Sequence, residues 1–160
     1  MQELSLRERT LENVKVFWEM SHDAELNRLF PFQKNTLGEA IELFEESKKP
    51  GAKSFGRTIC FGGRYIGDVW CYGIDEVVEK SAFVSIVIFD KAHWGMGLSK
   101  LALSRFCSLV FGSYALDRLC AFTYRENTRS VGMLRSIGFR NLGEFLEDGV
   151  ASYYFELPRP

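Results

Sequence analysis

The sequence SAFVSIVIFDKAHWGMGLSKLALSRFCSLVF, residues 81–111, contains the features that organise this chain. It opens with an apolar run rich in β-branched residues, Phe83–Phe89, which predicts a buried strand. A polar hinge and a glycine-rich turn follow, and from Leu98 the apolar residues recur at helical spacing. This order brings free backbone N–H groups and the positive end of a helix dipole together. The arrangement is typical of an anion site, most often one for phosphate.

The glycines of this turn, Gly95 and Gly97, are equally compatible with a tight strand-to-helix connection that binds nothing. Two nucleotide-binding motifs do not fit the turn. The P-loop, G-x-x-x-x-G-K-[ST], needs a longer loop, and Lys100 follows too early. The dinucleotide fingerprint G-x-G-x-x-G needs a glycine where Lys100 stands and a βαβ unit around it.

Length and composition predict one ordinary globular domain, residues 1–160. With 160 residues, 46% of them apolar, the chain is long enough to bury a sizeable core. The formal net charge is -1 and no basic block occurs, so we expect no nucleic-acid partner. No run of about 18 apolar residues and no signal-peptide core are present, so we expect a cytoplasmic protein without a membrane partner.

The cysteines and histidines do not predict a metal site. The chain has 4 cysteines with no C-x-x-C pair, and only 2 histidines, so we expect no zinc and no other metal. We expect the cysteines to be buried apolar thiols in a reducing compartment.

The N-terminal residues predict a short strand and a helix. The strand contains Leu4 and Leu6, which alternate with polar residues, and Thr10 caps the helix that follows. His22-Asp23 ends this helix, and one further turn precedes Pro31.

A second helix and a hairpin follow. A capping box at Thr36 begins the helix Leu37–Ser47. Phe55–Phe61 and Tyr65–Ile74 predict two strands around a tight glycine turn. Gly67, inside the second of these strands, indicates a bulge.

The C-terminal residues predict a strand, a helix and a final hairpin. The strand is Asp117–Tyr124, and Asn127 caps a helix over Thr128–Ser136 that ends at Gly138. The last two strands are expected at Phe139–Phe145 and Val150–Leu157.

Two segments resemble one known family. Trp94-Gly-Met-Gly97-Leu-Ser99 resembles the [QR]-x-x-G-x-[GA] loop of the GNAT superfamily of N-acetyltransferases, which cradles the pyrophosphate of acetyl-CoA. Trp94 replaces the usual Gln or Arg, as in the branch of ribosomal-protein N-terminal (Rim-type) and spermidine acetyltransferases, and Ser99 replaces Gly or Ala. The second segment, Asn127-x-x-Ser130 with Gly138-Phe139, is similar to the family's N-x-x-[SA] helix. Alone it is more typical of a helix cap; the pairing of the two segments carries the resemblance, which covers essentially the whole chain.

The resemblance implies an α/β (α+β) GNAT acyltransferase fold. This fold is a mixed, mostly antiparallel sheet of about seven strands, with about four helices on both faces and a splayed pair of central strands. The implied cofactor is acetyl-CoA: backbone groups near Ile88 and Phe89 would pair with its pantetheine arm, and the Asn127 side chain would contact it. The residues implied around the pyrophosphate are Trp94, Gly95, Met96, Gly97, Leu98, Ser99 and Lys100.

The implied reaction is attack of an amine on the thioester, but two catalytic residues of many relatives are missing. Leu134 stands where a Tyr protonates the departing thiolate, and the fourth strand has no Glu at Phe83, Val84 or Ser85. The remaining catalytic candidates are Glu79 as base, Ser85 as a relay through water, and Tyr124 and Ser130 as proton donors. Each also has a plain structural interpretation.

Two functions remain open from the sequence. The favoured one is an N-acetyltransferase, a monomer or homodimer, whose acceptor is a small-molecule or peptide amine. Without a base on the fourth strand, a peptide α-amine or an amino sugar is favoured over a lysine-like amine. The alternative is a non-catalytic CoA-binding or interaction module on the same fold.

Overall fold

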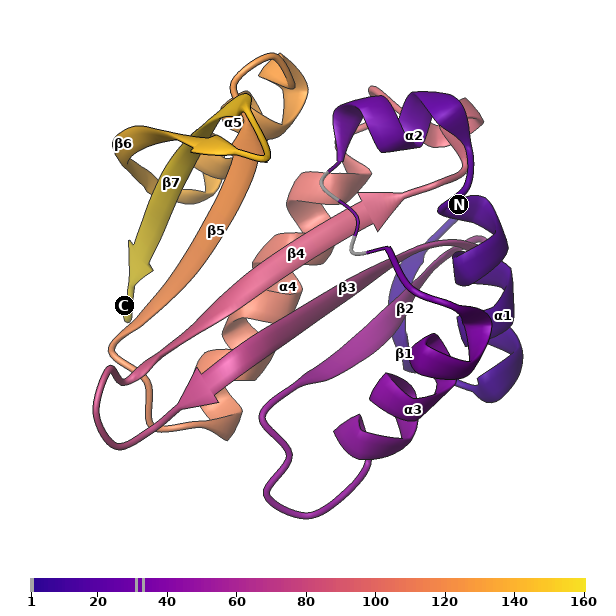
Figure 1. The fold of residues 1–160 in the computed structure, drawn as a ribbon, viewed down its shortest axis with the longest axis horizontal. Helices are drawn as coiled ribbons and strands as arrows, with labels where there is room; N and C mark the ends of the chain where they lie inside the picture. The colour runs from indigo at the N-terminus through magenta and orange to yellow at the C-terminus, as the bar shows by residue number, and fades with distance from the viewer. Residues whose placement is uncertain (1, 31, 33) are drawn as a thin grey trace.

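The computed structural model describes residues 2–30, 32 and 34–160, and its seven strands form one sheet (Figure 1). The strand order is β1-β2-β3-β4-β5-β7-β6, and all neighbours are antiparallel except β4 and β5. The strands are β1 Leu4–Glu8, β2 Phe55–Phe61, β3 Arg64–Asp75, β4 Ser81–Ile88, β5 Arg118–Tyr124, β6 Arg140–Glu147 and β7 Val150–Pro158. The mixed, mostly antiparallel sheet of seven strands expected from the sequence is confirmed.

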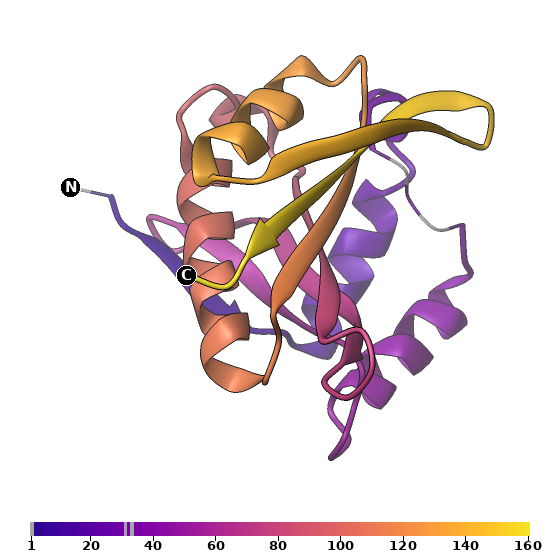
Figure 2. The ribbon, with the colours of Figure 1, turned by 90° about the vertical axis from the view of Figure 1, so that its left-hand side faces the viewer.

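Helices cover both faces of the sheet (Figure 2). α1 and α3 pack together on one face, whereas α4 crosses the other face and contacts α5. The helices are α1 Leu11–Met20, α2 Ala24–Leu29, α3 Leu37–Ser47, α4 Leu98–Ser113 and α5 Thr128–Ile137, with a 3-10 turn at Lys91–His93. No helix in the described part of the chain is long and apolar enough to cross a membrane.

The fifth helix, α2, is a correction to the sequence analysis, which predicted only a turn there. The Asp23 carboxylate accepts a hydrogen bond from the Leu26 N–H at 3.0 Å, so Asp23 begins α2 rather than merely ending α1. Pro31, to which the predicted turn led, lies outside the described residues. The capping box at Thr36 and the cap at Asn127 form as predicted. The predicted cap at Thr10 also forms, as part of a capping box with Asn13.

Gly67 is required by close backbone contact between β3 and β4. A Cβ at this position would lie 2.2 Å from the Val87 carbonyl oxygen and 2.8 Å from Ile88 Cα. The predicted bulge is present in β3, but the residue without a partner on β2 is Ile66, the neighbour of Gly67. The Ile66 carbonyl instead accepts the N–H of Phe89, just beyond β4, at 2.9 Å.

The cysteines are all free and buried, as expected. Burial raises the pKa of the Cys71 and Cys107 thiols to about 12, so these side chains are neutral packing groups rather than nucleophiles.

The parallel pairing of β4 and β5 is short. It covers Ser81 to Phe83 on β4 and Arg118 to Cys120 on β5, after which the strands separate. β5 stays in the sheet because it pairs with β7 along its whole length, from Arg118 to Tyr124. The splayed central pair is therefore present, and it opens toward the glycine turn (Figure 1).

We expect Gly67→Ala to lower the free energy of unfolding by at least about 2 kcal/mol, because the methyl group has no space between β3 and β4. The control is Gly132→Ala in α5, where a Cβ meets nothing within 4 Å. Since alanine is the better helix former, that variant should gain about 0.5–1 kcal/mol. Urea unfolding measures both; a neutral Gly67→Ala would contradict the packing described here.

Candidate functional site

The edge of β4 that faces the gap has backbone groups without a strand partner. The Phe89 N–H donates to β3. Because the backbone groups of alternate residues in a strand face the same neighbour, those of Val87 and Ser85 also point toward β3. Those of Ile86 and Ile88 therefore point into the gap between β4 and β5. An extended ligand with amide groups fits this edge as an added strand would. Ile88 was predicted for this role, whereas the Phe89 N–H is turned away from the gap.

Trp94 fixes the glycine turn to the end of β4. Its indole N–H donates to the Ile88 carbonyl at 2.8 Å, and its ring lies 5.8 Å from the Arg129 guanidinium on α5. This tryptophan, which departs from the common family pattern, thus gives one gap-facing carbonyl a hydrogen-bond donor. It also links β4, the turn and α5.

The N-terminus of α4 has no side-chain cap. Gly97, at the N-cap, has φ 75°, and Gly95 has φ 78°; these are left-handed conformations that favour glycine. The other four α-helices of the described chain are each capped by a side chain: Thr10, Asp23, Thr36 and Asn127. The first-turn N–H groups of α4, at residues 98–100, have no acceptor within the helix. A Cβ at either glycine would meet nothing within 4 Å, so the turn is open to an anion.

A cavity of about 710 Å³, here named the loop cavity, lies at this turn. It contains all the predicted cofactor residues except two: Phe89 and Met96 are not in its lining. Three cationic side chains from three helices surround it: Arg28, Lys100 and Arg129. The predicted lining residues are Ile88, Trp94, Gly95, Gly97, Leu98, Ser99, Lys100 and Asn127.

Helix α2 closes one side of the loop cavity, and the sequence analysis missed this role. The Lys91 ammonium, beside the turn, contacts Asp23 and Glu25 at 3.0 Å each. At the other end of α2, the Leu29 carbonyl accepts the Asn127 side-chain N–H at 3.3 Å. α2 is therefore attached both to the turn and to α5 (Figure 1).

Both ends of the Asn127 amide are used within the chain. Its Oδ1 accepts the Ser130 N–H at 3.2 Å while its Nδ2 donates to Leu29. The cap expected from the sequence is confirmed. A direct bond from Asn127 to the cofactor stays a prediction.

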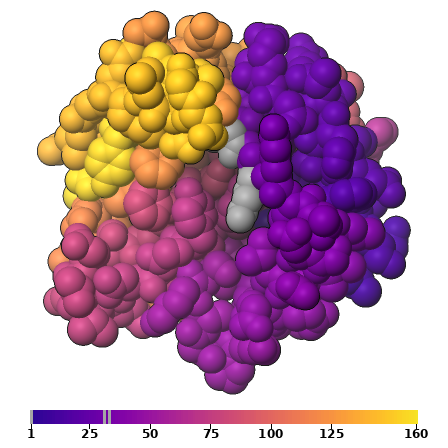
Figure 3. All heavy atoms as spheres, in the orientation of Figure 1, coloured from indigo at the N-terminus to yellow at the C-terminus, as the bar shows by residue number. Residues whose placement is uncertain are grey.

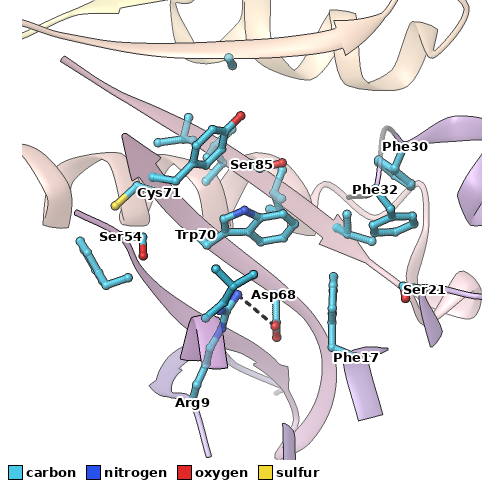
Figure 4. A pocket seen from close by; sticks show the side chains of 18 of the residues that line it. Arg9, Phe17, Ser21, Phe30, Phe32, Ser54, Asp68, Trp70, Cys71 and Ser85 are labelled. Atoms are coloured by element: carbon cyan, nitrogen blue, oxygen red, sulfur yellow. Dashed lines mark ion pairs between the residues drawn. The ribbon is translucent and has the colours of Figure 1, made fainter. Parts of the chain in front are cut away.

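A second cavity, of about 440 Å³, lies on the face of the sheet covered by α1 and α3; we name it the aromatic cavity. The molecular surface is hollowed between the N-terminal helices and the C-terminal strands (Figure 3), and Figure 4 shows the interior. Nine aromatic side chains line it: Phe17, Trp18, Phe30, Phe32, Phe44, Phe55, Trp70, Tyr72 and Phe122. Phe30, Ile86, Ser130 and Met133 line both cavities, so the two meet at the open end of the β4–β5 gap.

Two of the predicted catalytic residues reach these cavities. Ser85 lines the aromatic cavity from β4, beside Trp70 (Figure 4). Ser130 lies at the junction, in the first turn of α5. Leu134, in place of the family's Tyr, contributes an apolar wall to the aromatic cavity.

Tyr124 and Glu79 line neither cavity. Tyr124 is half-buried at the end of β5, and burial raises the pKa of its phenol. Glu79 lies at the closed end of the gap, where its carboxylate contacts Arg118 at 3.0 Å. This pairing follows from the register of β4 and β5, which a reading of the sequence alone does not contain.

The other acids of the β3–β4 connection are also held locally. The Asp75 carboxylate accepts the N–H groups of Val77, Val78 and Glu79, and these bonds lower its pKa. Glu76 accepts the Ala115 N–H at 2.8 Å. This connection therefore supplies fixed structural acceptors rather than a base at the junction.

A sequence profile described as the acetyltransferase (GNAT) domain matches residues 3–140. The chain belongs to the GNAT acetyltransferase family. It is accordingly an enzyme that transfers an acetyl group from acetyl-CoA. Among curated proteins, none matches the chain at a significant level.

Solved structures agree with the fold. Spermidine N-acetyltransferase from Vibrio cholerae, solved with CoA and spermine, superposes with a TM-score of 0.84 at 16% identity, covering 97% of this chain and 95% of that one. The aminoglycoside acetyltransferase AAC(6')-Ib with coenzyme A gives 0.77 at 15% identity, covering 98% and 95%. A domain from Methanocaldococcus jannaschii gives 0.80 at 14% identity, covering 99% and 100%.

The residues of the loop cavity fit acetyl-CoA. Uncapped N–H groups and cationic side chains suit its phosphates, and the gap-facing backbone of Ile86 and Ile88 suits its amide-bearing arm. In this GNAT enzyme the cofactor's reactive end would then meet the aromatic cavity at the junction.

We expect Gly97→Val to raise the Kd for acetyl-CoA at least tenfold, because the new side chain would occupy the space open to phosphate and strain the turn. The backbone cost is about 1–2 kcal/mol. Gly51→Val is the matched control, since Gly51 has the same φ of 75° and open space, but lines neither cavity. Calorimetric titration with acetyl-CoA measures both. Equal affinity in the two variants would remove the glycine turn from the cofactor site.

Proposed function

We propose that this GNAT enzyme acetylates a primary amine that is already partly neutral near pH 7, a peptide α-amine or an amino sugar. The observation that carries this proposal is the junction of the two cavities, which brings an acceptor to the β4–β5 gap through the aromatic cavity. The one carboxylate in the described lining of that cavity, Asp68, is paired with Arg9. The amine would enter through the aromatic cavity and meet the acetyl group at Ile86 and Ser130.

The chain's first task is to hold and orient both reactants, which supplies much of the acceleration in such transfers. Acetyl-CoA supplies an activated thioester whose carbonyl carbon the amine nitrogen attacks, with cleavage of the carbon–sulfur bond. The first turn of α4 would bind the phosphates, and the edge of β4 would align the arm. The gap-facing N–H of Ile86 is the donor that we assign to the carbonyl oxygen as negative charge develops there.

Proton movement needs one group on each side of the reaction. The amine nitrogen loses one proton, and the sulfur of the leaving thiolate gains one. We assign the second role to the Ser130 hydroxyl, because Ser130 lies where the two cavities join. To Ser85, which lines the acceptor side, we assign the transfer of the amine proton to water.

The acid within the aromatic cavity is not available as a base. The Asp68 side chain is 3% exposed; its Oδ2 lies 3.2 Å from Arg9, and its Oδ1 accepts the Tyr65 hydroxyl at 2.6 Å. An amine that must lose its own proton to water is therefore favoured when its pKa is low. An α-amine of pKa about 7.7–8.0 is neutral roughly one time in ten at pH 7, whereas a lysine amine of pKa about 10.4 is neutral about once in a few thousand.

The test compares two peptides of the same sequence, one with a free α-amine and a blocked lysine, the other with a blocked α-amine and a free lysine. We expect kcat/KM to be at least about a hundredfold higher for the α-amine at pH 7, reflecting the neutral fractions. Its logarithm should rise with pH at unit slope and level off near the α-amine's own pKa of about 8. A preference for the lysine, or a plateau already below pH 7, would mean that the enzyme supplies a base.

We expect Ser130→Ala to lower kcat at least about tenfold with little change in KM, because the proton donor to the thiolate acts in the transition state. The control Ser136→Ala removes a hydroxyl that lines the loop cavity but bonds to the Met133 carbonyl. Initial rates of thiol release measure both variants. If Ser130→Ala keeps the wild-type kcat, the proton donor to the thiolate is water and not Ser130.

A further inference from the structure

The aromatic cavity is built to hold an apolar group in a fixed position. The Phe17 ring contacts Phe32 and Trp70 edge-to-face, with centroids 6.0 and 5.7 Å apart. The Trp18 indole N–H donates to the Asn35 carbonyl at 3.0 Å, so the polar atom of that ring is satisfied within the chain. The aromatic cavity has a volume of about 440 Å³, which is in the range of small-ligand sites. The cavity thus offers rigid aromatic surface to an acceptor.

The charges in this cavity neutralise one another. Arg9 and Asp68 are the only charged side chains in its described lining, and they form an ion pair with each other (Figure 4). The Arg9 guanidinium lies over Gly56, where a Cβ would be 2.5 Å from its Cζ, and 5.8 Å from the Trp70 ring. Burial raises the pKa of the Asp68 carboxyl, against the opposing effects of Arg9 and Tyr65.

This arrangement disfavours a polycation. A second ammonium group entering the cavity would lose its hydration without gaining a carboxylate partner, which is costly. Asp68 already has partners on both oxygens. Polyamines and aminoglycosides are named for two of the solved neighbours. With this charge pattern, both are poor ligands of the aromatic cavity.

The aromatic surface continues to the mouth of the cavity. Tyr72 and Phe122, which line the cavity, are 38% and 39% exposed. Phe83 on β4 stacks between them, with centroid distances of 5.4 and 5.1 Å. An apolar group next to the reacting amine thus has a path of aromatic contacts from solvent to the junction.

We propose that the acceptor is an α-amine whose adjacent side chain is aromatic or otherwise large and apolar, such as a peptide that begins with such a residue. This inference rests on the proposed function and selects within it: the peptide α-amine over the amino sugar. The aromatic cavity takes the first side chain, and the amine projects through the junction toward Ile86 and Ser130.

The first experiment measures thiol release from acetyl-CoA by the full chain with Phe-Gly amide, Ala-Gly amide, spermidine and kanamycin. We expect kcat/KM for Phe-Gly amide to exceed that for Ala-Gly amide at least tenfold and that for either polycation at least a hundredfold. Faster reaction of Ala-Gly amide, spermidine or kanamycin overturns the inference while leaving amine acetylation in place.

Binding separates this inference from the proposed function. If none of these amines causes thiol release from acetyl-CoA, the proposed function fails for them. Calorimetric titration of the CoA-saturated protein with each amine then measures which one the aromatic cavity prefers. Tighter binding of Phe-Gly amide than of the other three supports the inference; tighter binding of any of them overturns it.

A charge introduced into the cavity provides the converse test. Ser54→Asp places a carboxylate in the lining (Figure 4), and it should shift the ratio of kcat/KM, or of affinity, toward spermidine at least tenfold. Ser108→Asp makes the same change on the exposed side of α4, outside both cavities, and should leave the ratio unchanged. An equal shift in both variants, or no shift in Ser54→Asp with the fold intact by circular dichroism, contradicts the charge argument.

Discussion

The early end of the pairing between β4 and β5 is the constraint on which the rest of the site depends. Beyond Phe83 and Cys120 the strands separate, so backbone groups of Ile86 and Ile88 face a gap instead of a neighbouring strand. The Ile88 carbonyl accepts the Trp94 indole N–H, whereas the other gap-facing groups have no strand partner. Leaving such a group without a partner costs free energy, about 1–3 kcal/mol for each buried one. An extended amide-bearing ligand would offset that cost, which links the gap between β4 and β5 to cofactor binding.

The fold tolerates the gap because other contacts hold its two sides. β5 is paired with β7 along its full length, and β4 with β3. The closed end is held by the short parallel ladder and by the pairing of Arg118 with Glu79 and Glu156. At the open end, Trp94 bonds to β4 and α2 is attached to both the turn and α5. The uncapped start of α4 lies at this open end, where a phosphate can take the place of the missing cap.

Local patterns in the sequence predicted the parts of the site that depend on neighbouring residues. The apolar run before the glycine turn, the glycines at Gly95 and Gly97, and the cap at Asn127 each follow from short-range backbone requirements. α2 was missed because Asp23 was interpreted as a helix end, and its partner Lys91 comes from a distant part of the chain. The direction of the Phe89 N–H depends on the register between β3 and β4, which no local pattern contains.

The acceptor side was the least predictable part. The pairing of Arg9 with Asp68, and the room that Gly56 leaves for it, unite three strand or loop segments that only the folded sheet brings together. Glu79, a plausible base by its distance along the sequence, lies at the wrong end of β4 to reach the junction. Ser130 was selected beside Asn127, and its place between the two cavities became apparent only in three dimensions.

Hydrogen exchange of individual amides, followed by NMR with and without acetyl-CoA, tests the central claim most directly. If the cofactor completes the β4 edge and the start of α4, exchange should slow at Ile86, Ile88 and residues 98–100, and stay unchanged in β1 and at the tip of the β6–β7 hairpin. Protection that appears elsewhere, with the amides of Ile86 and Ile88 unaffected at saturating acetyl-CoA, would contradict the account.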